Sequence, residues 1–241
     1  FHSPQSSEGT GLCCAHRRDD CFCAYLGWIQ FNRYVYTDSI GNMIYLDSIV
    51  NSVFNSMTYL IHSDNSQDLY IVDCGDVQPI INYVHKYELT LRGIFLTHTH
   101  FDHIYGLNEV VSAFPQSTIY TSEHGKEGLY SPKYNMSRYQ IEIPHFIYRF
   151  DNVAIIDENA SLPLFDGVAM QVLSTPGHDW SCLSYLLDRW LFTGDSLIPN
   201  TRLLVHFPKS DKTVAYKQYE RLQQLAELNK LEIKSGHYVH N

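Results

Sequence analysis

The stretch Thr97-His98-Thr99-His100-Phe101-Asp102-His103 places three histidines and one aspartate at positions 98–103. The apolar run 93–96 that precedes it predicts a short buried strand. Because side chains of a strand alternate between its two faces, His98 and His100 should point to the same side. A turn after them would bring the aspartate and the third histidine to the same point. Imidazole nitrogens and carboxylate oxygens bind zinc, and catalytic zinc sites leave one position for water. The stretch therefore predicts a catalytic metal site rather than a polar loop in which histidines gather incidentally.

Length and charge narrow the class of protein. The 241 residues fit one large domain or two small ones, and a hydrophobic fraction of 44% allows a sizeable core. The net charge is −9, and no dense run of Lys and Arg is present, so nucleic acid and anionic membranes are poor partners. No apolar stretch approaches the ~18 residues that a membrane span needs. We expect a small-molecule substrate, and the sequence leaves the oligomeric state open.

The first 25 residues differ from the rest of the chain. They are rich in Ser and Gly and then contain Cys13, Cys14, His16, Cys21 and Cys23. The spacing is not the Cys-x-x-Cys of common zinc sites, which favours a disordered tail over a small zinc knot. The stretch also lacks the layout of a secretory signal. Because the chain begins with Phe, we expect a fragment or a processed product.

Two other cysteines, Cys74 and Cys182, lie in apolar strand-like segments and predict buried thiols. We interpret this cysteine usage as that of a reducing, cytoplasmic compartment.

Three further strand ends deliver polar residues beside a glycine. Gly177-His178-Asp179 follows the predicted strand 168–173, Gly194-Asp195 follows the hairpin 182–192, and Gly236-His237 follows the strand 231–233. Helices are predicted at 77–84, 107–114, 123–130 and 211–229, so strands and helices alternate in both halves. This alternation predicts a layered α/β architecture with the site along one shared edge.

Residues 130–150 interrupt the alternation. Aromatic residues crowd there, namely Tyr130, Tyr134, Tyr139, Phe146 and Tyr148. The stretch is either a flap that gives the site aromatic walls or a surface excursion whose rings pack on the core. The sequence leaves both interpretations open.

Taken together, His98-x-His100-x-Asp102-His103, Gly177-His178, Gly194-Asp195 and Gly236-His237 resemble the motifs of the metallo-β-lactamase-fold hydrolases. The resemblance is greatest to the glyoxalase II-like branch and extends from about Tyr36 to the end of the chain. It implies a four-layered αβ/βα sandwich over residues 26–241, with the metal site at one edge of the two sheets. Asp73 resembles the family's aspartate that orients a ligand.

The resemblance also implies the roles of the site residues. His98, His100 and His178 would hold one metal; Asp102, His103 and His237 would hold the second; Asp195 would bridge both. The implied cofactor is two Zn²⁺, with iron or manganese also compatible. The implied enzyme is a metal-dependent hydrolase of a thioester, ester or lactone, with a metal-bridging hydroxide as nucleophile and Asp102 as proton acceptor.

Two departures from the family pattern bear on the substrate. Asp179-Trp180-Ser181-Cys182 stands where the family has a small residue and then Gly-Ser, so Asp179 either orients a ligand histidine or adds negative charge. The chain ends four residues after His237, so we expect the glutathione-binding C-terminal domain of glyoxalase II to be missing. Asp195 at the bridging position argues against β-lactam hydrolysis.

Other functions remain as alternatives. An iron-dependent, persulfide-dioxygenase-like oxidoreductase shares the motif set. A phosphodiesterase or nuclease is disfavoured by the acidic charge, and a non-catalytic scaffold by the complete ligand set. The run Gly194-Asp195-Ser196-Leu197 spells a serine-esterase motif, but that motif belongs near a chain start. Among the remaining histidines, His206 is a better candidate for the pocket than His124 or His145.

Overall fold

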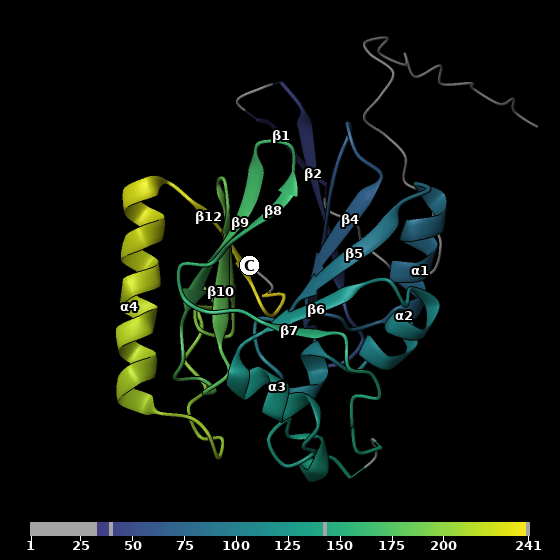
Figure 1. Ribbon diagram of the computed structural model, residues 1–241. Helices are drawn as coiled ribbons and strands as arrows, with labels where there is room; N and C mark the ends of the chain where they lie inside the picture. Colours follow the sequence, from purple (N-terminus) through teal and green to yellow (C-terminus); the bar gives the residue numbers. More distant parts are fainter. Residues whose placement is uncertain (1–32, 39–40, 142–143, 240–241) are drawn as a thin grey trace, which may run out of the picture.

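The fold consists of two β-sheets packed face to face, with helices on both outer sides (Figure 1). The computed structural model describes residues 33–38, 41–141 and 144–239. The predicted cysteine-containing tail lies outside these residues, as does Ile29-Gln30-Phe31, whose apolar alternation also predicts a strand.

The first sheet has the order β1-β2-β3-β4-β5-β6-β7. The neighbours from β1 to β4 are antiparallel, and those from β4 to β7 are parallel. Because parallel strands end at the same edge of a sheet, the residues that follow β4 and β5 emerge side by side. The strands are β1 (Tyr34–Thr37), β2 (Met43–Val50), β3 (Met57–Ser63), β4 (Asp68–Val72), β5 (Thr90–Phe95), β6 (Thr118–Thr121) and β7 (Val153–Ile155).

The second sheet has the order β12-β11-β10-β9-β8. Only β11 and β12 run parallel to each other; the other described neighbours are antiparallel. Its strands are β8 (Ser161–Phe165), β9 (Val168–Ser174), β10 (Leu183–Leu187), β11 (Trp190–Gly194) and β12 (Glu232–Ser235).

Helices α1 and α2 cover the outer side of the first sheet, and α4 covers the outer side of the second (Figure 1). Of the two residues that the sequence offers as caps of α4, Ser210 and Asp211, the structure uses Asp211, whose carboxylate accepts a hydrogen bond from the backbone N–H of Val214. The helices are α1 (Val77–Lys86), α2 (Leu107–Ala113), α3 (Glu123–Leu129) and α4 (Lys212–Asn229), with short 3₁₀ turns at Phe101–His103 and Ser137–Tyr139.

Three apolar clusters fill the spaces between the layers, and the strand alternation divides residues among them. On β3, Leu60 packs toward α1 and α2, whereas Tyr59 and Ile61 pack between the sheets. On β11, Leu191 packs toward α4. The four-layered αβ/βα sandwich expected from the resemblance is therefore confirmed.

Two edge strands, β1 and β8, were not predicted from the sequence. The strand β8 contains Pro163, which has no N–H for a ladder bond and is tolerated at the edge of a sheet. The strand β1 exposes Tyr34 and Val35, so it carries no buried apolar run. The predicted last strand, 231–233, begins and ends later in the structure, which carries it to within two residues of His237.

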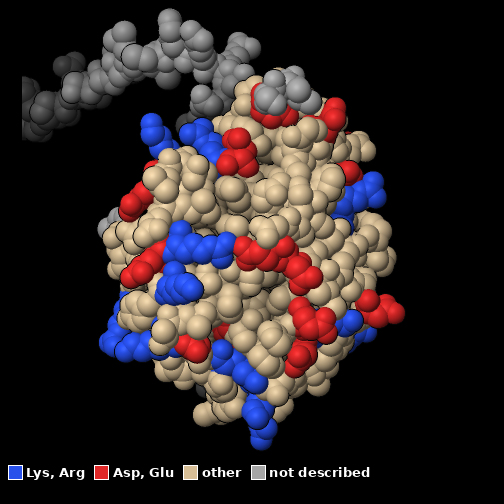
Figure 2. Space-filling model, turned by 60° about the vertical axis from the view of Figure 1, so that its left-hand side comes forward, with Lys and Arg blue, Asp and Glu red and all other residues tan. Residues whose placement is uncertain are grey.

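The surface seen in Figure 2 mixes the two signs of charge. Basic and acidic side chains are interspersed on this face, without a broad patch of either. Among the described residues, no helix is both long enough and apolar enough to cross a membrane.

Candidate metal centre

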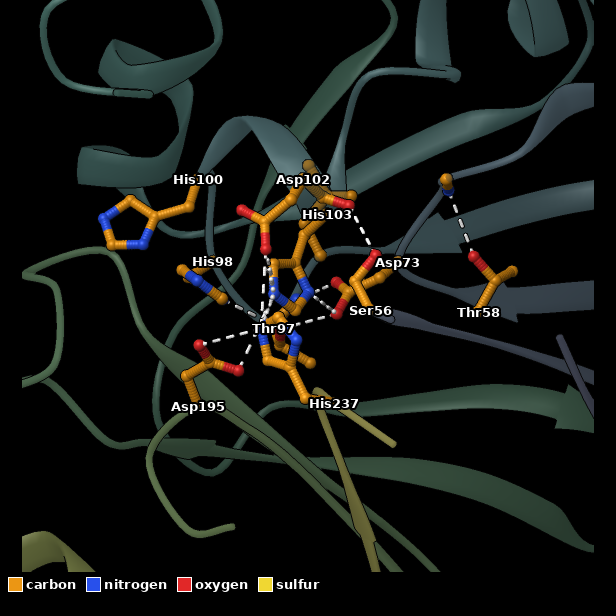
Figure 3. A network of polar contacts seen from close by, with 12 residues as sticks. Ser56, Thr58, Asp73, Thr97, His98, His100, Asp102, His103, Asp195 and His237 are labelled. Carbon is orange, nitrogen blue, oxygen red and sulfur yellow. Dashed lines mark hydrogen bonds and ion pairs between the residues drawn. The ribbon is translucent and has the colours of Figure 1, made fainter. Parts of the chain in front are cut away.

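The structure brings all seven predicted metal ligands together at the edge where strands of both sheets end. Figure 3 shows these ligands with the exception of His178. The stretch 97–103 follows β5, and η1 (Phe101–His103) supplies its turn. The other three ligands follow β9, β11 and β12. The possible ligand atoms form three groups whose members lie within 4.8 Å of one another: His98, His100 and His178; His98, His103 and Asp195; Asp102, His103 and His237.

In three of the histidines, the ring nitrogen that points away from the centre, Nδ1, contacts an acceptor of the protein. We call this the outer nitrogen and Nε2 the inner one. Nδ1 of His178 donates to the Leu204 carbonyl over 2.8 Å, and Nδ1 of His237 donates to the Phe54 carbonyl over 2.9 Å. Nδ1 of His103 lies 2.9 Å from the carboxylate of Asp73. Since a carbonyl can only accept, the proton of each neutral ring sits on the outer nitrogen. In its neutral form, each ring therefore presents an Nε2 lone pair to the centre. Although burial lowers the pKa of His103, the surrounding carboxylates raise it to about 10, so a metal would displace a proton there on binding.

Neighbouring lone pairs face one another at short distances, and two acceptors cannot form a hydrogen bond with each other. Nε2 of His178 lies 3.1 Å from Nδ1 of His100, and Nε2 of His103 lies 3.3 Å from Nε2 of His237. Buried Nε2 of His98 has no hydrogen-bond partner among the described residues. A cation would resolve both features, and nitrogen and oxygen donors suit zinc or iron. The residues present fit the metal centre that the sequence implied.

Asp195 lies between the histidines predicted to hold the first metal and those predicted to hold the second. One carboxylate oxygen is 3.6 Å from His103 Nε2, and the other is 3.5 Å from His178 Nε2 and 3.3 Å from His237 Nε2. A carboxylate in this position can reach a metal on either side.

Asp73 holds the start of the ligand stretch in place. Its carboxylate accepts from the backbone N–H and the hydroxyl of Thr97, each over 2.7 Å, and also contacts His103. All of these groups are buried. This is the orienting position that the sequence resemblance implied for Asp73.

Asp179, the departure from the family pattern, faces His100. Its Oδ2 lies 3.6 Å from His100 Nε2, which is the nitrogen turned away from the centre. The Asp179 Oδ1 accepts from the backbone N–H of Ser181 over 2.9 Å. Although burial raises the pKa of Asp179, its contacts with His100 and Ser181 lower it more. Of the two roles expected from the sequence, this geometry favours orientation of a ligand histidine.

Burial sets the protonation of two ligands. It lowers the pKa of His178 to about 4 and that of His98 well below the ordinary value. Asp195 is also buried, which raises its pKa, but the surrounding histidines outweigh burial and hold that pKa well below its usual range. Neutral imidazoles and an ionised carboxylate are the forms that bind a metal.

Two glycines allow the close approach on which the centre depends. A Cβ on Gly106 would lie 1.9 Å from the Gly75 carbonyl oxygen, and one on Gly236 would lie 2.3 Å from Asp195 Oδ1. Gly106, three residues after His103, thus permits the close backbone packing behind the site.

A pocket of about 750 Å³ opens beside the centre, and five of the predicted ligands line it. The stretch 130–150 reaches this pocket through Met136 and Gln140. Its own aromatic rings do not line the pocket: Phe146 and Tyr148 pack into the core, as the second interpretation expected.

The remaining candidate histidines do not line the pocket. His206 is exposed, and its neighbours Leu204 and Phe207 line the pocket instead. His124 stacks on Trp180 with ring centroids 4.0 Å apart, and His145 is exposed. Sequence reasoning missed Phe54 and Leu204 as pocket residues, because an isolated apolar residue in a loop carries no functional signal.

Comparison with known proteins agrees with this geometry. Residues 51–237 match the family model of the metallo-beta-lactamase superfamily, and the chain belongs to this superfamily. A hydroxyacylglutathione hydrolase from Shewanella oneidensis is 33% identical over 151 residues, covering 61% of this chain and 50% of that protein. A probable metallo-hydrolase from Streptococcus pyogenes is 32% identical over 168 residues, covering 67% and 70%. The crystal structure of BLEG-1 B3 metallo-beta-lactamase superposes with a TM-score of 0.72 at 24% identity, covering 80% and 92%.

The resemblance to the glyoxalase II-like branch is thereby confirmed, while the last comparison shows the fold alone. The chain spans about half the length of the hydroxyacylglutathione hydrolases that it matches. Family membership and the clustered His and Asp residues support a metal-binding site.

Proposed function

We propose that the protein is a dinuclear zinc hydrolase that cleaves a thioester, ester or lactone. The observation that carries the proposal is the position of Asp195, whose carboxylate lies within 3.6 Å of histidines from both groups. In this proposal His98, His100 and His178 hold one metal, Asp102, His103 and His237 hold the other, and Asp195 bridges them.

Residues of the chain would accept a proton during the reaction and hold a metal-binding histidine in place. When bound, two cations lower the pKa of a shared water and polarise the scissile carbonyl. Asp102 lines the pocket and lies 3.4 Å from His237 Nε2, so its carboxylate can accept a proton at the edge of the centre. Asp73 keeps His103 in the required orientation. The hydroxyacylglutathione hydrolase relatives support a thioester as one substrate class.

Elemental analysis of the purified protein, together with hydrolysis of simple thioesters and lactones, tests this proposal. We expect about two zinc ions per chain and hydrolytic turnover. Replacing Asp195 with alanine should remove metal and turnover together, whereas the matched change Asp166→Ala, in the exposed turn before β9, should leave both intact. Full turnover in the Asp195 variant would refute the assignment of the centre.

The same metal analysis and hydrolysis assay distinguish the proposed hydrolase from the main alternative, an iron-dependent oxidoreductase. His and Asp ligands also suit iron, as an oxidoreductase of the persulfide-dioxygenase kind would require. About one iron per chain without hydrolysis would favour that alternative.

A further inference from the structure

The pocket beside the metal centre combines a polar floor with apolar walls. The floor is formed by five of the predicted metal ligands, and the walls come from loops far apart in the sequence. The apolar wall residues that matter here are Phe54, Met136, Ile198, Leu203, Leu204 and Phe207. Since these side chains surround the position where a scissile bond would lie, they decide which acyl group fits.

Two of the wall residues remain open to solvent. Phe54 is 59% exposed and Leu204 is 47% exposed, although both stand beside a buried cluster of charged and polar groups. Large apolar side chains left exposed at the mouth of a pocket lose contact with water only when something apolar covers them. An apolar part of the substrate would do so in each catalytic cycle.

We propose that the pocket binds a long apolar acyl group, of roughly eight carbons, and that the substrate is an acyl thioester or ester of that kind. This inference rests on the proposed hydrolase function and names its substrate class. A pocket of about 750 Å³ greatly exceeds the needs of an acetyl group. Its apolar walls would gain little from a small polar acyl group.

The pocket also contains one cationic side chain, which would contact an anionic leaving group. Among the described residues that line the pocket, Arg202 is the only Lys or Arg, and it is exposed on the same loop as Leu203 and Leu204. The acidic residues of the pocket are the predicted metal ligands, so Arg202 is available to an anionic carrier. A thiol carrier that bears phosphate or carboxylate groups fits this position.

A series of para-nitrophenyl esters from acetyl to octanoyl, with the zinc-loaded protein, measures the acyl preference. Each buried methylene is worth about four-fold in kcat/KM, so burial of about half of the added chain should favour the octanoyl ester over the acetyl ester by on the order of 100-fold. Comparing octanoyl-coenzyme A with octanoyl-glutathione then distinguishes a phosphate carrier from a carboxylate carrier. Arg202→Gln should raise KM for the anionic thioesters by a larger factor than KM for the neutral octanoyl ester.

Leu204→Ala and its matched control Leu228→Ala connect the preference to the wall. Leu204 lines the pocket, and its backbone carbonyl, which accepts from His178, is retained in the variant. Leu228 is 83% exposed on α4 and does not line the pocket. The octanoyl-to-acetyl ratio should fall several-fold in the first variant and stay unchanged in the second.

Binding of octanoate and acetate, measured by thermal shift, separates this inference from the proposed function. Ester hydrolysis with no preference for long acyl groups would overturn the inference and leave the hydrolase intact. Octanoate binding that Leu204→Ala weakens, without any hydrolysis, would support the apolar pocket and refute the hydrolase. The absence of both octanoate binding and ester hydrolysis would refute the inference and the proposed function together.

Discussion

Replacing Asp179 with asparagine should weaken metal binding although Asp179 is not a predicted ligand. Its Oδ2 lies 3.6 Å from His100 Nε2, and its Oδ1 accepts from the backbone N–H of Ser181. An asparagine can keep only one of these contacts. If its oxygen faces Ser181, its amide N–H groups face the N–H of His100; if it flips, the Ser181 N–H loses its acceptor.

The size of the effect follows from the length of the contact. Carboxylates that orient a ligand histidine contribute about 10- to 100-fold to metal affinity. A distance of 3.6 Å is longer than a good hydrogen bond, so we expect the lower end of this range. A loss of about tenfold corresponds to about 1.4 kcal/mol of binding free energy.

Competition with a chromophoric zinc chelator measures this loss. Asp166→Asn is the matched control, because it removes the same charge in the exposed turn before β9, at the end of that strand away from the site. Zinc affinity should fall in the Asp179 variant and remain at the wild-type level in the control. Wild-type affinity in both variants would refute the orienting role of Asp179.

Three further outcomes test the fold. Gly106→Ala forces a Cβ to within 1.9 Å of the Gly75 carbonyl oxygen, so the free energy of unfolding should fall by about 1–3 kcal/mol in urea denaturation; an unchanged midpoint would contradict the close packing. Asp211→Ala removes the cap that accepts from Val214 N–H and should cost about 1 kcal/mol, whereas Asp211→Asn should retain most of it. Burial lowers the pKa of His62 below its ordinary value. The unfolded chain therefore takes up a proton at about pH 6.5 that the folded protein resists, so the wild type should lose stability relative to His62→Phe as the pH falls below that value. A difference between these two proteins that does not vary with pH would contradict this reasoning.

The cluster of His and Asp residues could be predicted from the sequence because its signals are local. A His-x-His pair after a buried strand and a glycine beside His178, Asp195 and His237 each specify a strand end that carries a polar side chain. The structure brings these side chains close together, and their role as metal ligands stays a prediction. The edge strands β1 and β8 were not predicted, since exposed residues and Pro163 remove the apolar alternation on which strand prediction depends.

The stretch 130–150 shows where local pattern gives no answer. Its aromatic residues suited a pocket wall as well as a core, and the structure sends Phe146 and Tyr148 to the core while Met136 reaches the pocket. Aromatic side chains gain free energy wherever they are buried, so composition alone does not distinguish these destinations.

The sequence by itself determined the chemistry of the centre, because the identity of imidazole and carboxylate groups and their spacing along strands are properties of short segments. Only the tertiary structure decided what surrounds that centre. The contact between His100 and Asp179, and the wall that Phe54 shares with Leu204, join residues far apart in the chain. Such contacts arise when two sheets pack and loops from both meet at one edge, and no local propensity encodes them.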